Sequence, residues 1–172
     1  REFEYNREIE PGTVRAFPVI DTARGLLRAA EVVQAVPRVA GLVFASDRYA
    51  EDVGARHEER GERLAYARGA VIAAARAFDG LPLVETTGFE ALHLAQWGFA
   101  GAIVPSERVV PQVNAAFSVT DGDVERARAH IQAFEQAKQS GGWVARYGTS
   151  VIDSSAVRKA RQVLQADEQA RR

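Results

Sequence analysis

Short apolar runs alternate with helical patterns along most of this chain, and this alternation constrains its fold more than any other feature. Apolar and β-branched residues predict four strands, at residues 16–20, 39–44, 81–84 and 101–104. Helical periodicity predicts helices between the strands, at residues 23–36, 62–77 and 89–97. Strands that alternate with helices are typical of parallel sheets. We therefore expect an α/β fold with parallel β/α units.

The chain becomes helical after residue 105. We expect three helices there, at residues 108–117, 121–138 and 155–170. Thr120 followed by Asp123 predicts an N-cap similar to a capping box, with Asp in place of the usual Glu or Gln. The Gly141–Gly142 pair interrupts the helical pattern. We expect two domains, a β/α portion at residues 1–138 and a C-terminal lid or tail at residues 139–172.

Composition excludes several classes of function. The 172 residues carry a formal net charge of -1 with the signs interspersed, which favours neither nucleic acid nor an anionic membrane as a partner. Cysteine is absent, so disulfides and thiol catalysis are excluded. No apolar run approaches the roughly 18 residues that span a bilayer. We expect a cytoplasmic protein.

Two of the predicted strands run directly into acidic residues. Asp21 follows the first strand, and Asp47 follows the second by a short distance. The carboxyl ends of parallel strands are where α/β proteins place their functional side chains, so the two carboxylates could share a cation. An alternative is that Asp21 caps the following helix and that Asp47 belongs to an ordinary acidic loop. Arg24, near the start of that helix, could hold a carboxylate or phosphate.

Five segments together resemble a known family, the citrate lyase β-subunit-like group of the HpcH/HpaI aldolase superfamily. They are IDTARGLLRAAEVV, GLVFASDRYAEDVG, YARGAVIAAARA, GFAGAIVPSERVVPQVNAAF and SVIDSSAVRKARQVL. The resemblance implies part of a TIM barrel, a Mg²⁺ ion held by two carboxylates, and carbon–carbon cleavage of a 3-hydroxyacyl thioester. The substrate would be a malyl-CoA, a citramalyl-CoA or a citryl thioester, carried on CoA or on an acyl carrier.

The resemblance also assigns roles to individual residues. Asp21 takes the place of the Glu that is the family's first metal ligand, and Asp153 matches its catalytic carboxylate. Alignment through residues 52–54 puts Arg48 on the family's second metal ligand and Asp47 beside it. An arginine cannot ligate a cation, so the resemblance implies that Mg²⁺ binding is weak or lost. Asp153 could instead be only the cap of the last helix.

The family's first four β/α units have no counterpart before Arg15. A complete barrel typically takes about 250 residues, and four strands cannot close one. The sequence is either a fragment whose amino-terminal half is lost or supplied elsewhere, or a genuine half barrel that pairs with another chain. We expect a homo-oligomer, or pairing with a chain that supplies the amino-terminal half. The main functional hypothesis is a carbon–carbon lyase. The alternative is a non-catalytic homologue that serves as a binding or assembly subunit.

Overall fold

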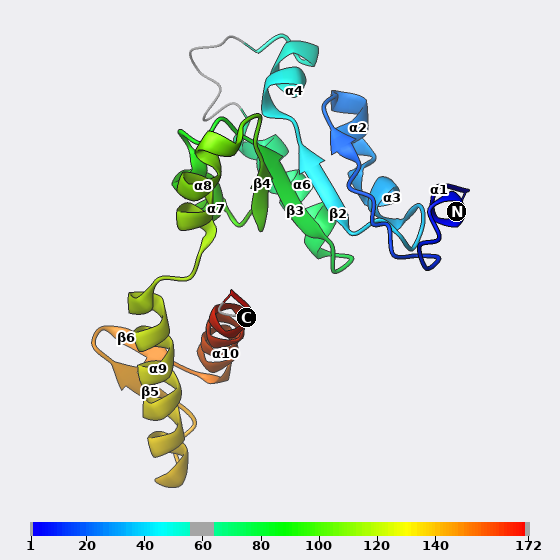
Figure 1. The fold of residues 1–172 in the computed structure, drawn as a ribbon. Helices are drawn as coiled ribbons and strands as arrows, with labels where there is room; N and C mark the ends of the chain where they lie inside the picture. Colours follow the sequence, from blue (N-terminus) through cyan, green and yellow to red (C-terminus); the bar gives the residue numbers. More distant parts are fainter. Residues whose placement is uncertain (1, 56–63, 171–172) are drawn as a thin grey trace. The chain divides into compact units, whose positions relative to one another are not determined.

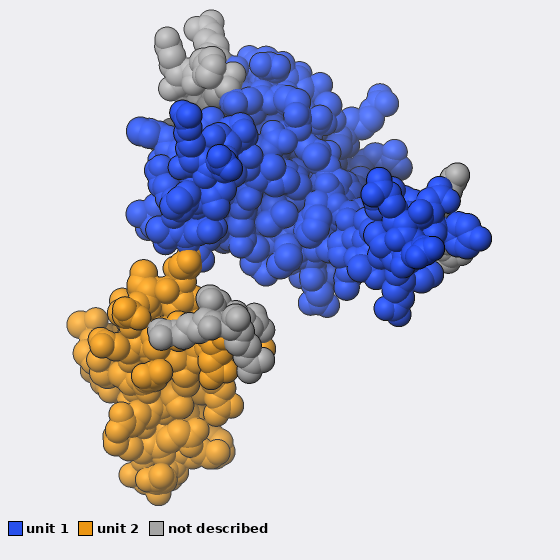
Figure 2. Space-filling model, in the orientation of Figure 1, with its two compact units in different colours: residues 1–117 blue, residues 118–172 orange. Residues whose placement is uncertain are grey.

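The computed structural model describes residues 2–55 and 64–170, which form two compact units. Figure 2 shows them in different colours, residues 1–117 and residues 118–172. The division falls before the long helix that we assigned to the β/α portion. Whether residues 1–138 and 139–172 divide the chain by function stays a prediction.

The first unit is built on a four-stranded parallel sheet, in agreement with the sequence-based expectation. The strands lie in chain order and are β1 (Val19–Ile20), β2 (Gly41–Phe44), β3 (Leu81–Glu85) and β4 (Gly101–Ile103). The first strand is shorter than predicted because Pro18 lacks an N–H group for the ladder. Before Pro18, only a single bridge joins Ala16 to Val39. Gly41 permits the close approach of β2 to β3, since a Cβ atom there would overlap the carbonyl oxygen of Leu81.

Helices follow each strand and build the core on one face of the sheet (Figure 1). They are α2 (Ala23–Leu27), α3 (Ala29–Gln34), α4 (Ser46–Asp52), α6 (Ala65–Arg76) and α7 (Ala91–Trp97). A short helix α1 (Glu2–Asn6) precedes them, and the 3₁₀ turn η2 (Glu107–Val109) with α8 (Val110–Phe117) ends the unit.

Two helix predictions differ from the structure in detail. The helix expected at residues 23–36 is divided at Arg28, whose N–H bonds back to Gly25 and Leu26 in a tightened turn. The start of the helix expected at residues 62–77 lies outside the described residues, and α6 covers the rest.

The register of the strands separates two faces of the sheet. Ile20, Phe44 and Val84 lie side by side across the strands and are buried with the helices in the core. Val19, Leu81 and Ile103 belong to the other face, where they are 42%, 44% and 45% exposed. This second face is apolar and incompletely covered.

A buried carboxylate anchors the N-terminal segment to the rest of the first unit. Glu4 is 1% exposed and pairs with Arg38 at 3.1 Å, while its other oxygen accepts the backbone N–H groups of Gly12 and Val14 at 3.0 Å. Hydrogen bonding from Arg38, followed by the bond from Val14, lowers the pKa of Glu4 to about 2. Folding of this segment therefore depends on an ionised Glu4.

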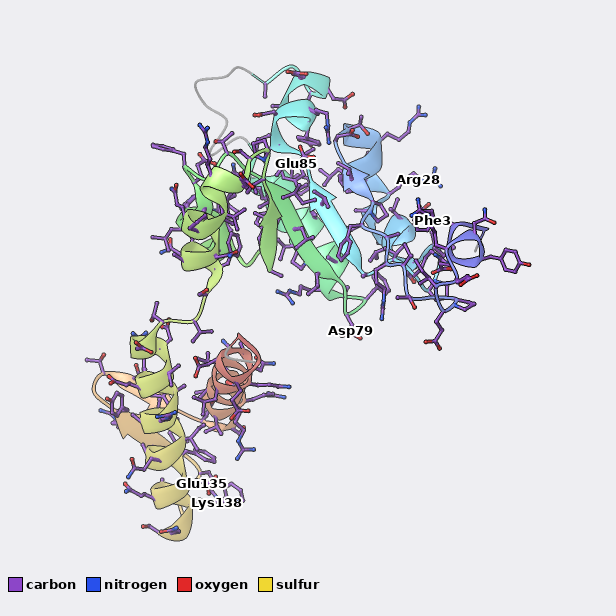
Figure 3. All side chains as sticks on the ribbon, in the orientation of Figure 1. Phe3, Arg28, Asp79, Glu85, Glu135 and Lys138 are labelled. Carbon is purple, nitrogen blue, oxygen red and sulfur yellow. The ribbon has the colours of Figure 1, made fainter. Side chains whose placement is uncertain are left out.

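The second unit consists of two helices and a hairpin. The helices are α9 (Asp121–Gln139) and α10 (Ser154–Ala170), and the hairpin joins β5 (Ala145–Tyr147) to β6 (Ser150–Ile152). The predicted capping box is confirmed, because the Thr120 hydroxyl accepts the Asp123 N–H and the Asp123 carboxylate accepts the Thr120 N–H. The two helices pack on each other, and an ion pair of 3.6 Å joins Glu135, labelled in Figure 3, to Arg161.

None of the helices in residues 2–55 and 64–170 is long and apolar enough to cross a membrane.

Candidate functional site

A cluster of charged side chains lies at the carboxyl ends of β1, β2 and β3. Asp21 follows β1 directly, and Glu85 is the last residue of β3. Arg48 lies in the first turn of α4, which leaves the end of β2. Its guanidinium donates from Nη2 to Oε1 of Glu85 at 2.9 Å, and its Nε lies 3.5 Å from Oδ2 of Asp21.

Strand register explains why these residues meet. Val19 pairs with Val43, and Val43 pairs with Leu83, so Asp21, Ala45 and Glu85 stand two residues further along the three strands. Side chains two residues apart point to the same face of a sheet. Ala45, between the two carboxylates, has a small side chain and is fully buried. The charged head of Arg48 can therefore reach across from α4 to both neighbours. Figure 3 labels Glu85 at this end of the sheet, beside α4.

The three charged side chains are partly accessible to solvent. Arg48 is 52% exposed, Asp21 42% and Glu85 37%. The cluster combines two negative charges with one positive charge.

Asp47 lies next to Arg48 in the chain and lines a cavity of about 630 Å³. The cavity extends from the carboxyl end of β3 between α6 and α7. Its wall combines the hydroxyl groups of Ser46, Thr86 and Thr87 with apolar side chains, Leu64, Phe89, Leu94, Ile103, Val104 and Pro105, and with the charged residues Asp47, Arg68, Glu85 and Glu90.

Arg68 is the buried charge of this cavity. Its side chain is 3% exposed and pairs with Glu90 at 3.3 Å. Its Nε and Nη1 atoms are buried and have no hydrogen-bond partner among the described residues. Buried donors without acceptors are uncommon. The sequence analysis missed Arg68, because nothing in the helical pattern around it distinguishes a buried arginine from an exposed one.

Arg24 lies in α2 and is exposed. Two of the N–H groups at the start of this five-residue helix have partners inside the chain. Gly25 donates to the Thr22 hydroxyl at 3.1 Å, and Ala23 donates to Oδ2 of Asp52 at 2.8 Å. Arg24 can therefore contact an anion through its own side chain, without support from the helix terminus.

Asp153 lies in the second unit, at the start of α10. Its Oδ1 accepts hydrogen bonds from the N–H groups of Ser155 and Ala156 and from the Ser155 hydroxyl, all at 2.8 to 2.9 Å. The bond from Ala156, followed by the Ser155 hydroxyl, lowers the pKa of Asp153. Asp153 is thus an exposed, ionised N-cap, as the structural alternative predicted. These hydrogen bonds use Oδ1 of Asp153 and leave its Oδ2 for other contacts.

In the part of the chain that the structure describes, no group of three or more His, Asp or Glu side chains could hold a metal ion together. Asp21, one of the two residues of the predicted shared cation site, instead shares the Arg48 guanidinium with Glu85. The sequence analysis missed Glu85. The position of Glu85 directly after the apolar run LPLV was the available signal.

The fold and the charged cluster define a segment of a parallel β/α protein whose polar side chains gather at the carboxyl edge of its sheet. The family model described as HpcH/HpaI aldolase/citrate lyase matches residues 1–105. The chain belongs to this family.

Curated relatives extend the similarity over most of the chain. The citrate lyase subunit beta of Leuconostoc mesenteroides subsp. cremoris is 30% identical over 95% of this chain and 56% of the relative. A (3S)-malyl-CoA thioesterase of Cereibacter sphaeroides is 32% identical over 85% of this chain and 54% of the relative. The chain thus spans about half the length of these relatives.

A solved structure supports the assignment of the fold. The CitE protein of Mycobacterium tuberculosis, in complex with magnesium, acetoacetate and coenzyme A, superposes with a TM-score of 0.74. The match covers 90% of this chain and 61% of that chain at 20% sequence identity. At this identity the likeness shows a shared fold, which agrees with the expected portion of a TIM barrel.

Proposed function

We propose that this chain forms part of a carbon–carbon lyase that acts on a 3-hydroxyacyl thioester. The observation that carries the proposal is the membership of this chain in the HpcH/HpaI aldolase/citrate lyase family, together with polar side chains at the carboxyl edge of its sheet. In β/α barrels this edge is where catalytic residues gather. The candidate substrates are malyl, citramalyl and citryl thioesters of CoA or of an acyl carrier.

The reaction would break the bond between the thioester α-carbon and the carbon that bears the hydroxyl group. A water molecule takes the hydroxyl proton, the hydroxyl oxygen becomes a carbonyl, and the bonding pair moves onto the thioester as an enolate. A proton delivered to the α-carbon completes the cleavage. In the reverse direction a base removes that proton, and general bases of this kind act through an ionised carboxylate.

We assign the proton transfer at the α-carbon to Asp153. Asp153 is ionised near neutral pH, as a base in the direction of condensation must be, while the hydrogen bonds from Ala156 and Ser155 that lower its pKa also make it a weaker base. The same carboxyl group would return the proton during cleavage. Arg24 is the proposed contact for an anionic group of the substrate.

Magnesium does not fit this edge of the sheet as its side chains are arranged. Asp21, the first proposed ligand, directly follows β1. However, Asp21 and Glu85 both contact the Arg48 guanidinium. Asp47, the second proposed ligand, lines the adjacent cavity. A Mg²⁺ ion, which prefers an octahedron of oxygen ligands, would have to compete with the positive charge of Arg48 for the carboxylates of Asp21 and Glu85. We therefore assign no step of the reaction to a metal ion.

We further propose that a second polypeptide covers the open face of the sheet. Val19, Leu81 and Ile103 leave apolar surface exposed there, and exposed apolar patches favour association. Another copy of the chain, or a chain that carries the other half of the barrel, would supply the cover. Sedimentation across micromolar concentrations tests this, and a stable monomer would contradict it.

Product analysis tests the lyase function. The native assembly should convert a malyl thioester labelled with ¹³C into an acetyl thioester and a two-carbon oxo acid, both identified by NMR. Release of free malate and thiol would indicate thioester hydrolysis and would replace the lyase proposal. If none of the three thioesters is changed but one of them binds, the chain is a binding subunit.

A further inference from the structure

The contacts of Arg48 connect two strands that are not neighbours. Asp21 and Glu85 stand at the ends of β1 and β3, and the guanidinium spans the end of β2 between them. Another exposed arginine, Arg28, pairs with a carboxylate nearby in sequence, that of Glu31, three residues further on, at 2.7 Å. Arg48 instead reaches two carboxylates that the sheet holds at matching register.

We infer that Arg48 is a covalently attached cation that occupies the position of a divalent metal ion and keeps this pair of carboxylates closed to metals. The inference rests on the contacts of Asp21, Arg48 and Glu85, and it holds whether or not the assembly cleaves thioesters. It departs from the solved relative that carries magnesium.

Two physical effects exclude the metal. First, one oxygen of each carboxylate faces the guanidinium, because Oε1 of Glu85 accepts the Nη2 donor at 2.9 Å and Oδ2 of Asp21 lies 3.5 Å from Nε. Second, the guanidinium stays charged at every accessible pH, so it repels a divalent ion that approaches the same oxygens. The repulsion acts over a few ångströms and doubles for a divalent ion.

The exposure of the cluster makes the arrangement reversible by mutation. All three side chains are more than one third exposed, so each ion pair adds little to the stability of the fold. Removing Arg48 should therefore leave the sheet intact and leave two carboxylates facing each other across Ala45. Their mutual repulsion then favours a cation between them.

The inference predicts a gain of metal binding on mutation. The full 172-residue chain is titrated with Mn²⁺ alone by calorimetry and by electron paramagnetic resonance, after circular dichroism has verified its fold. Arg48→Ala and Arg48→Gln should bind Mn²⁺ about 10-fold more tightly than the wild type, or better. The use of two neutral replacements guards against a folding defect that is specific to one of them.

Three controls locate the gain. Arg28→Ala makes the same change in net charge by breaking an exposed pair elsewhere, and it should gain nothing. Arg48→Lys keeps the charge and should also gain nothing. Adding Asp21→Asn or Glu85→Gln to Arg48→Ala should return the affinity to that of the wild type.

The inference is overturned by any of three results. They are a folded Arg48→Ala variant that binds Mn²⁺ no more tightly than the wild type, a gain in Arg48→Lys equal to that in Arg48→Ala, and a gain that survives the loss of both carboxylates.

Discussion

Arg48 and Glu85 form an ion pair of 2.9 Å between the first turn of α4 and the last residue of β3. Thirty-seven positions separate the two residues in sequence, and the parallel pairing of β2 with β3 brings them together. The same guanidinium also lies 3.5 Å from Asp21, which follows β1.

Glu85→Gln should change the free energy of unfolding by less than about 1 kcal/mol, because exposed ion pairs are screened by solvent. Urea unfolding at low and high salt measures the change, and the small loss should shrink further in high salt. A decrease of several kcal/mol in the free energy of unfolding would mean that the main role of the cluster is to stabilise the fold.

The contribution of Glu4 to the stability of the first unit should be lost in acid. The folded-state pKa of Glu4, about 2, lies below the ordinary value of 4.5, so the ionised form is stabilised by folding. This stabilisation is fully present above pH 4.5 and is lost as the pH falls toward 2. Glu4→Gln should be less stable than the wild type at neutral pH, and its urea midpoint should fall less steeply in acid.

The control for Glu4 is Glu31→Gln, which alters an exposed pair with Arg28. Its urea midpoints should follow those of the wild type throughout the acid range. Parallel acid profiles for Glu4→Gln and the wild type would show that the buried pair with Arg38 does not contribute as described.

Arg68 and Glu90 should respond unequally to mutation. Glu90→Gln removes the negative charge that neutralises the buried Arg68, two of whose nitrogens already lack acceptors among the described residues. The expected loss is about 1 to 3 kcal/mol. Arg68→Met removes the buried charge together with its unsatisfied donors and fills a similar volume, so its loss should be smaller. Urea unfolding of both variants decides, and the reverse order would contradict the arrangement.

Local sequence patterns predicted most of the first unit. Apolar runs and stop signals located all four strands of this unit. In the second unit, the Thr120–Asp123 capping box was confirmed. The patterns missed the hairpin of β5 and β6, since three-residue strands are too short to show alternation, although Gly148 with a φ of 59° marks its turn. Helix α1 was missed for the same reason, as it has only five residues.

The charged cluster was only half predicted, because strand register is not a local property. Asp21 was identified from its place after β1, but its partner across the sheet depends on which residues of β2 and β3 stand at the same level. Ala45, the residue directly after β2, stands beside Asp21 in the strand register, and Asp47 lies further along the chain in α4. Glu85 occupies the level on β3. Once the strand order and one pair of aligned residues are known, counting two residues beyond that pair on β3 identifies Glu85.

Asp153 provides the most direct test of the lyase proposal. Asn is as good an N-cap as Asp, so Asp153→Asn should keep α10 capped, with unchanged circular dichroism and ligand binding. Asp123→Asn is the matched control, because it neutralises the other capping carboxylate of the same unit and should keep full activity.

The measurement is the turnover of a malyl, citramalyl or citryl thioester by the whole native assembly, with wild-type chain and with each of these two variants. Asp153→Asn should lower turnover by a factor of about 10² or more, the usual contribution of a general acid–base group. Turnover at the wild-type rate in Asp153→Asn would contradict the catalytic assignment and leave Asp153 as a helix cap alone.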